Sequence, residues 1–134
     1  MNKYESLNKD IFSIFAASTW VAENIKTFPE NFTGAGTEYI RVGIVASSYD
    51  KKGSQSSAFG QLIIDIFFPA GAGNARAIYI ADKLDTYLVG KTLVGSNNGN
   101  TQMGTSTLTY LGNDKADPSL YRASYSISFN YFGK

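Results

Sequence analysis

The sequence predicts an α+β domain, in which a four-stranded, mostly antiparallel sheet carries two helices packed on one face. Three observations predict it: an amphipathic pattern near the N-terminus, a strand–turn–helix run over residues 60–88, and a strict alternation over residues 120–132. The expected order is helix, strand, strand, helix, strand, strand, with long hairpin loops. A chain of 134 residues is the size of one domain, so we expect a single domain over 1–134.

The first helix is expected over residues 3–17. No Pro or Gly interrupts this stretch, and its apolar side chains recur three or four residues apart, at Tyr4, Leu7, Ile11, Ile14 and Phe15. Residues 18–36 then read as a turn-rich connection. We expect Trp20, Val21 and Ile25 to hold this connection against the core.

Two strands follow, over residues 38–47 and 61–68. Each alternates between two faces, and one face carries Ile40, Val42, Ile44 and Ala46 in the first strand and Leu62, Ile64, Ile66 and Phe68 in the second. The polar segment 48–57 between them is predicted to be a long hairpin loop, because it shows no periodicity.

The second helix follows a glycine turn. Pro69 has no N–H for a sheet ladder, and Gly71 and Gly73 allow a sharp change of direction. The apolar stripe of the helix is predicted at Ala77, Ile78, Ala81, Leu84 and Leu88, and Gly90 is a C-terminal stop. We expect Ile64, Ile66 and Phe68 to be buried beneath Ile78, Ala81 and Leu84.

The last third of the chain predicts a strand pair. Residues 91–95 fit a short edge strand, and the Asn- and Gly-rich residues 96–104 read as a flexible loop. Residues 105–111 and 120–132 then form an antiparallel pair. In the final strand the aromatic and aliphatic side chains point one way and Arg122, with small polar residues, points the other.

One face of such a sheet is left without helices. It carries the small polar residues of the final strand together with Ile63, Asp65 and Phe67. A semi-apolar face of this kind often contacts a partner.

The composition excludes several classes of site. The chain has no Cys and no His, which excludes disulfides, thiolate or imidazole metal ligands, and a Cys or His nucleophile. The formal net charge is +1 and there is no basic block, so sequence-specific nucleic-acid binding is not expected. The longest apolar run, residues 62–68, is too short for a bilayer, and the polar N-terminus does not resemble a signal peptide. We expect a cytosolic site of synthesis.

No motif predicts catalysis or a cofactor. Gly90-Lys91-Thr92 ends like a phosphate-binding loop, but Asp85 stands where the first glycine is needed, and a helix precedes the turn. Gly71-Ala72-Gly73 fits a strand-to-helix turn better than a dinucleotide motif, because Arg76 replaces the third glycine. The acidic residues form no recognisable pair, and no Ser lies in a G-x-S-x-G elbow. We therefore expect no enzyme activity, no cofactor and no metal.

The candidate site is instead an interface. Arg41 and Arg122 lie within strands, where an arginine forms a salt bridge, lies on a solvated face or contacts another subunit. The full set of candidate contacts to a neighbouring subunit or another protein is Arg41, Tyr49, Lys51, Lys52, Ile63, Phe67 and Arg122.

Several segments together resemble the tail terminator proteins of bacteriophages with long, non-contractile tails. The resemblance rests on Tyr39-Ile40-Arg41, on the run from Gly60 through Pro69-Ala70-Gly71-Ala72-Gly73, on Ala81-Asp82, and on the segment from Trp20 to Asn24. It covers most of residues 4–90, and the C-terminal third agrees in pattern only.

The resemblance implies a virion protein without chemistry of its own. Six copies would form a ring on the last ring of the tail tube, at the head-proximal end of the tail, after assembly in the host cytoplasm. The ring would stop tube polymerisation and present a surface to a head-completion or connector protein, with a lumen through which DNA passes. Two other classes stay open: another head–tail joining or minor tail protein, and a small α+β hydrolase or ligand-binding protein.

Overall fold

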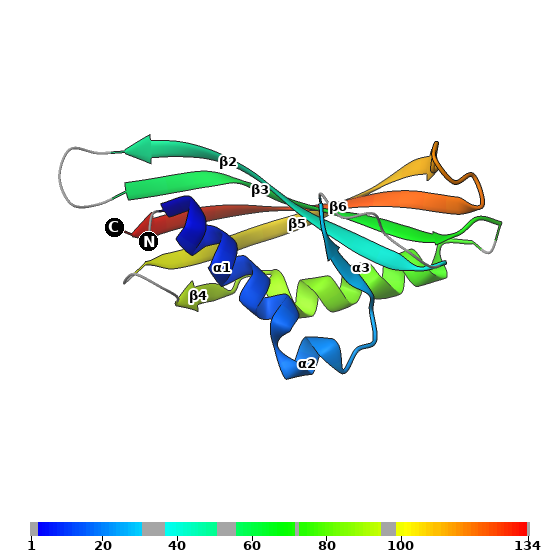
Figure 1. The fold of residues 1–134 in the computed structure, drawn as a ribbon, viewed down its shortest axis with the longest axis horizontal. Coiled ribbons are helices and arrows are strands. Elements are labelled where there is room, and N and C mark those ends of the chain that lie inside the picture. The colour runs from blue at the N-terminus through cyan, green and yellow to red at the C-terminus, as the bar shows by residue number, and fades with distance from the viewer. Residues whose placement is uncertain (1–2, 31–36, 51–55, 72, 95–98, 134) are drawn as a thin grey trace.

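The protein forms one curled, six-stranded mixed sheet with short helices on one face (Figure 1). The computed structural model describes residues 3–30, 37–50, 56–71, 73–94 and 99–133. The strands are ordered β1-β2-β3-β6-β5-β4 across the sheet. Their bounds are Thr27–Pro29 for β1, Tyr39–Asp50 for β2, Ser56–Pro69 for β3, Thr92–Val94 for β4, Asn100–Asn113 for β5 and Leu120–Gly133 for β6.

The predicted fold class is therefore wrong. The sheet has six strands instead of four, the chain is mostly β, and the order is not helix, strand, strand, helix, strand, strand. Strand β1 was missed because it is a three-residue segment in a Pro-containing connection, and it is a strand only by virtue of its parallel pairing with β2. Strand β4, three residues long, confirms the short edge strand expected over residues 91–95 and adds the other edge by pairing with β5.

Helices α1 (Lys3–Ala16) and α3 (Ala75–Leu88) cover the same face of the sheet. In Figure 1, α1 lies over the end of the sheet that holds both chain termini, and α3 lies toward the opposite end. The four-residue helix α2 (Ser18–Val21) follows α1. Its Trp20 is buried and donates from Nε1 to Thr27 Oγ1 at 3.0 Å, which confirms that Trp20 holds this connection.

The core lies between these helices and the sheet. The inward faces of the middle strands are fully buried, as predicted for Leu62, Ile64, Ile66 and Phe68. On α3 the buried residues are Ala77, Ile80, Ala81, Leu84 and Leu88, and the predicted core residue Ile78 is 48% exposed. Each helical residue turns about 100° from the one before, so Ile78 faces away from the stripe that Ala77 begins.

Both predicted loops are in part strand. Strand β2 runs to Asp50 and β3 begins at Ser56, so only residues 51–55 remain of the first loop, and they lie outside the described residues. Strand β5 begins at Asn100, inside the second predicted loop. Its Thr101 and Met103 are buried and pair with Tyr131 and Phe129. A long aromatic partner strand thus imposes strand structure on a segment of low intrinsic preference.

The glycine turn after β3 has the expected geometry. Gly71 and Gly73 have φ values of 82° and 80°, in the left-handed region that side chains disfavour. The turn reverses the chain from the end of β3 into α3, which packs back along the sheet. The second helix and its start were therefore predicted correctly.

Candidate interaction surface

The face of the sheet opposite the helices, here called the open face, carries an ordered group of charged and aromatic side chains. Across three strands the register places Tyr39 opposite Phe67, and Phe67 opposite Arg122. Two residues after Tyr39 on β2, Arg41 lies opposite Asp65 on β3. Because side chains alternate between faces along a strand, all five project from the open face.

Asp65 is the anion of this group. Arg122 Nη2 donates to Asp65 Oδ1 at 3.2 Å, and Arg41 Nη2 lies 4.0 Å from Asp65 Oδ2. The carboxylate side chain is 18% exposed, whereas Arg41 and Arg122 are 30% and 37% exposed. Two guanidinium groups share one carboxylate, so the group carries an excess positive charge at the surface.

Phe67 forms the floor beneath the arginines. The Arg41 Cζ atom lies 4.8 Å from the centroid of the Phe67 ring, and Arg122 Cζ lies 6.0 Å from it. Tyr39 stacks on the same ring with a centroid separation of 4.6 Å. Leu120 and the half-buried Phe28 pack with Tyr39 and Phe67, and these four side chains form an apolar cluster separate from the main core. Cation–π contact and the ion pair together fix both guanidinium groups in place.

The pKa of Tyr39 is consistent with a net positive charge on this group of side chains. Burial raises the pKa of the Tyr39 phenol, while the neighbouring Arg41 opposes the rise. The phenol therefore stays protonated, and the positive charge of the arginines is not neutralised by a tyrosinate. Fixed guanidinium donors on an aromatic floor are well suited to a carboxylate on a partner, since arginine binds such groups with two parallel hydrogen bonds.

The other end of the open face is apolar and exposed. Three large side chains there, Val45, Phe59 and Phe132, are each about half exposed. The register places Phe59 opposite Ser47 and Phe132 opposite Ser57, so all three share the open face. Between the two ends lies Ile63, half-buried, with only Gly43 and Ser126 opposite it. A positive zone and an apolar zone on one sheet face form a candidate protein-binding surface.

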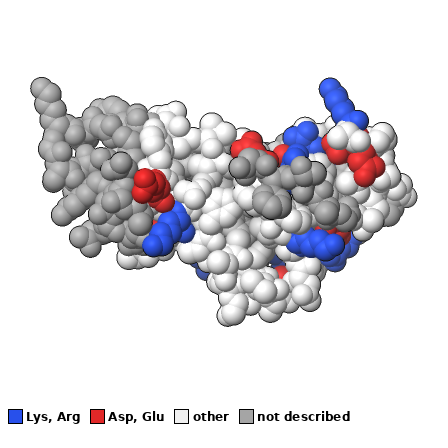
Figure 2. Space-filling view, viewed as in Figure 1, with Lys and Arg blue, Asp and Glu red and all other residues white. Residues whose placement is uncertain are grey.

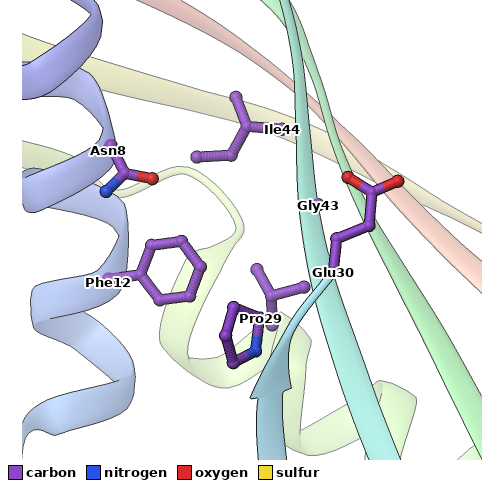
Figure 3. A pocket seen from close by; sticks show the side chains of 7 residues that line it. Asn8, Phe12, Pro29, Glu30, Gly43 and Ile44 are labelled. Atoms are coloured by element: carbon purple, nitrogen blue, oxygen red, sulfur yellow. The ribbon is translucent and has the colours of Figure 1, made fainter. Parts of the chain in front are cut away.

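A groove lies on the helix side, between α1 and the edge strand β2 (Figure 3). One part has a volume of about 350 Å³ and is lined by Asn8, Phe12, Pro29, Glu30, Val42, Gly43 and Ile44. A second part of about 270 Å³ shares Asn8 and Ile44 and adds Tyr4, Leu7 and Ala46. The Glu30 carboxylate lies over Gly43 on the open face, on the far side of β2 from Asn8 and Phe12 (Figure 3), because an added Cβ at Gly43 would point to that face and come within 2.6 Å of Glu30 Oε2.

Most of the described residues that line the groove are apolar. Its only ionisable carboxylate among the described lining residues is Glu30. Across the described part of the chain, no group of three or more acidic residues could hold a metal ion. None of the described helices is long and apolar enough to cross a membrane. Figure 2 shows acidic and basic side chains interspersed at the end away from the chain termini, without one extended positive patch on this face.

The predicted contact residues do not all come together. Arg41, Phe67 and Arg122 are brought together in one cluster, although Phe67 is its buried floor and not an exposed contact. Ile63 lies on the same face. Tyr49 is in β2, where it pairs with Ser57. Lys51 and Lys52 lie outside the described residues. Whether any of these residues contacts another subunit stays a prediction.

Sequence reasoning missed Asp65 and Tyr39 as members of the cluster. A signal was available, because Asp65 lies two residues before Phe67 and Tyr39 two residues before Arg41. The alternation of a strand places each of these pairs on one face. The alternation within each strand does not determine the register between strands, and it is this register that sets Arg41 opposite Asp65.

Two solved structures share this fold over their whole length. A chain from the virion of a native gene transfer agent (GTA) particle aligns with a TM-score of 0.71 and 18% identity, covering 97% of both chains. A second structure without a descriptive name aligns with a TM-score of 0.60 and 16% identity, covering 96% of this chain and 92% of its own. No protein family model and no curated protein matches the sequence.

Proposed function

We propose that this chain is a structural protein of a bacteriophage-type virion, without enzymatic activity. The observation that carries the proposal is the end-to-end likeness of its fold to a chain of a gene transfer agent virion, which covers 97% of both chains. At 18% identity this likeness concerns the fold. The resemblance of the Tyr39-Ile40-Arg41 and Pro69-Ala70-Gly71-Ala72-Gly73 segments to tail terminators supports the same class of function.

The more specific proposal is a tail terminator. Six copies form a ring on the head-proximal end of the tail tube, stop its polymerisation and present a surface to a head-completion or connector protein. The ring leaves a lumen through which DNA passes, and no sequence-specific binding of the DNA is involved. The open face supports this role, because a fixed positive cluster and an exposed apolar zone can each contact a protein neighbour.

Termination of this kind needs no chemistry. A tube grows when each added ring recreates the surface that accepted it, so a cap stops growth by presenting a different surface. The absence of Cys and His from the chain is compatible with this mechanism. Neither a nucleotide nor a metal is required.

Deletion of the gene tests the proposal. Without the protein, tails should reach uncontrolled lengths and fail to join heads, while the tube protein still polymerises. The purified chain added to polymerising tube protein should stop extension in a buffer without nucleotide or divalent metal. Thr86→Ser, an exposed change on α3 that keeps the hydroxyl donating to Asp82 O of the same helix, is the matched variant that should terminate as well as the natural chain.

Two outcomes would redirect the proposal. Tails of normal length that cannot join heads would assign the chain to another head–tail joining role. Tails of normal length that do join heads would overturn both the terminator and the joining roles.

A further inference from the structure

The two edges of the sheet are only partly paired within the chain. On one side, β1 pairs with β2 only at Ile40, Arg41 and Val42. Beyond Val42, no described strand pairs with the outer side of β2, which continues to Asp50. We call residues 43–47 the β2 edge. Unpaired strand edges present backbone donors and acceptors to any strand that can approach.

The other side of the sheet shows the same arrangement at the opposite end. Strand β4 pairs with β5 at Asn100, Thr101 and Gln102. Two further contacts extend this pairing, since Met103 N–H donates to Lys91 O at 2.8 Å and Gly90 N–H donates to Gly104 O at 3.3 Å. Beyond Gly104, no described strand pairs with the outer side of β5. We call residues 105–110 the β5 edge.

The two free edges are staggered along the strands and overlap in part. Following the register across the strands, Ser47 is level with Phe59, Asn130 and Gln102, which β4 covers, whereas Gly43 is level with Ile63, Ser126 and Thr107 on the β5 edge. By the same route Ile40 is level with Tyr110, so the far end of the β5 edge lies level with the part of β2 that β1 covers. Each free edge thus extends past the other at one end.

The strand directions are also complementary. Every pairing from β2 through β3 and β6 to β5 is antiparallel, so β2 and β5 run in opposite directions. If two copies in the same orientation are placed side by side and slid until Val45 of one lies opposite Thr109 of the other, the β2 edge and the β5 edge meet as an antiparallel pair with matching faces. At this offset β1 and β4 overlap the other copy only at the ends of the paired strands.

The side chains match the same arrangement. The β2 edge carries Ile44 and Ala46 on the helix side, where they line the groove against α1 (Figure 3). The β5 edge carries Leu108 and Tyr110 on its own helix side, and Tyr110 is 40% exposed. In the slid pair these side chains of one copy face the groove of the next. The β5 edge has no charged residue and no Pro, so it meets the requirements of an added strand.

We infer that copies of this chain join head to tail by strand addition, the β5 edge of one copy pairing with the β2 edge of the next and Tyr110 entering the groove between α1 and β2. The inference deepens the proposed ring and rests on it. If every copy is displaced along its strands by the same amount relative to the copy before it, the strands are tilted relative to the ring axis. The staggered strand register of closed barrels has the same effect. A head-to-tail contact of this type closes into a ring when the rotation permits.

Engineered disulfides test this pairing, and the natural chain contributes no background because it has no Cys. Val45→Cys places a thiol on the β2 edge, and Thr107→Cys or Thr109→Cys places one on the β5 edge, all at exposed positions on the open face. Within one chain the two edges are three strand spacings apart, about 14 Å, which exceeds the reach of a disulfide. Any bond between them therefore joins two copies.

The experiment uses the purified full chain, alone and bound to tail tubes, with ring formation measured by native mass and electron microscopy. After mild oxidation, Val45→Cys combined with Thr109→Cys should give a ladder of covalent multimers that ends at the ring size, and Val45→Cys with Thr107→Cys, two residues from the paired position, should cross-link less. Each single variant should give at most a small fraction of dimer. Val45→Cys with Ser128→Cys is the matched control, because Ser128 is exposed on β6, a strand that has neighbours on both sides.

The outcomes separate the two proposals. Rings that form without any cross-link between the β2 and β5 edges overturn the strand pairing and leave the proposed ring intact. If no ring forms with or without tubes, the proposed ring and the inference fall together. Equal cross-linking in the Ser128→Cys control would mean non-specific collision and would also overturn the pairing.

Discussion

The hydroxyl of Tyr125 donates a hydrogen bond to Asp85 Oδ1 at 2.6 Å, which ties the middle of β6 to α3. The same carboxylate oxygen accepts from Ser106 Oγ on β5, also at 2.6 Å. Tyr125 is buried, and Ser106 lies next to a register irregularity of β5. One carboxylate on α3 therefore holds the helix on two strands that meet beneath it.

Tyr125→Phe should destabilise the fold by about 1.5–3 kcal/mol, the usual range for a hydrogen bond to a charged group. The ring stays in the core, so the change removes the hydroxyl with little effect on packing. Urea unfolding of the two proteins measures the difference. Tyr110→Phe is the matched control, because Tyr110 is exposed and no hydrogen bond constrains it to the core. Equal midpoints for the natural chain and Tyr125→Phe would contradict the role of this bond.

The same tyrosine makes stability depend on alkaline pH. Burial raises the pKa of Tyr125, and the hydrogen bond to Asp85 raises it further. A group whose folded-state pKa lies above its unfolded value stabilises the fold fully below the unfolded value, about 10 for tyrosine, and loses that contribution as pH rises through the folded one. The free energy of unfolding should fall above about pH 10, and less steeply in Tyr125→Phe. Identical slopes for the two proteins would contradict the prediction.

Ile66→Ala should cost about 2–5 kcal/mol, because it removes a fully buried side chain and leaves a cavity. Ile63→Ala, a neighbouring change of the same size on the open face, should cost clearly less, since Ile63 is only half-buried. Chemical denaturation gives both values. A loss below about 0.5 kcal/mol for Ile66→Ala would mean that the strand register is wrong by one residue.

Arg122→Gln should weaken assembly onto tail tubes while the isolated subunit stays folded. The ion pair of Arg122 with Asp65 is partly exposed, and such pairs contribute at most about 1 kcal/mol to stability. Arg76→Gln is the control, because Arg76 forms an exposed pair with Glu38 at the start of α3, away from the open-face cluster. Co-sedimentation with tubes measures binding. If both variants bind like the natural chain, the arginine cluster is not part of the interface.

Hydrogen exchange should show which strand edges become covered on assembly. Amides of the β2 edge and the β5 edge should exchange more slowly in the ring than in the free subunit, because strand addition gives their outward N–H groups acceptors. Amides of residues 62–68 in β3 serve as the internal control, since β3 has strand neighbours on both sides in a single copy. Unchanged exchange at both edges in rings of proven size would contradict the pairing.

The sequence by itself determined the long, strongly periodic elements. Helix α1, the strand–glycine turn–helix run from β3 to α3, and the alternation of β6 were predicted because each repeats its apolar residues at the period of its own backbone. Composition also sufficed to exclude Cys and His chemistry. The expectation of a partner-binding open face followed from the same alternation, although its residues were only partly identified.

Only the tertiary structure decided the rest, because it depends on neighbours that are distant in sequence. Strand β1 has three residues and exists through its parallel pairing with β2, and the short edge strand expected over residues 91–95 finds its partner in β5. The start of β5 is Asn- and Gly-rich and becomes a strand against the aromatic β6. The register sets Arg41 opposite Asp65, and packing against the sheet selects Ile80 over Ile78 for the core. Local periodicity specifies which way a side chain can point, whereas pairing and packing specify what it meets.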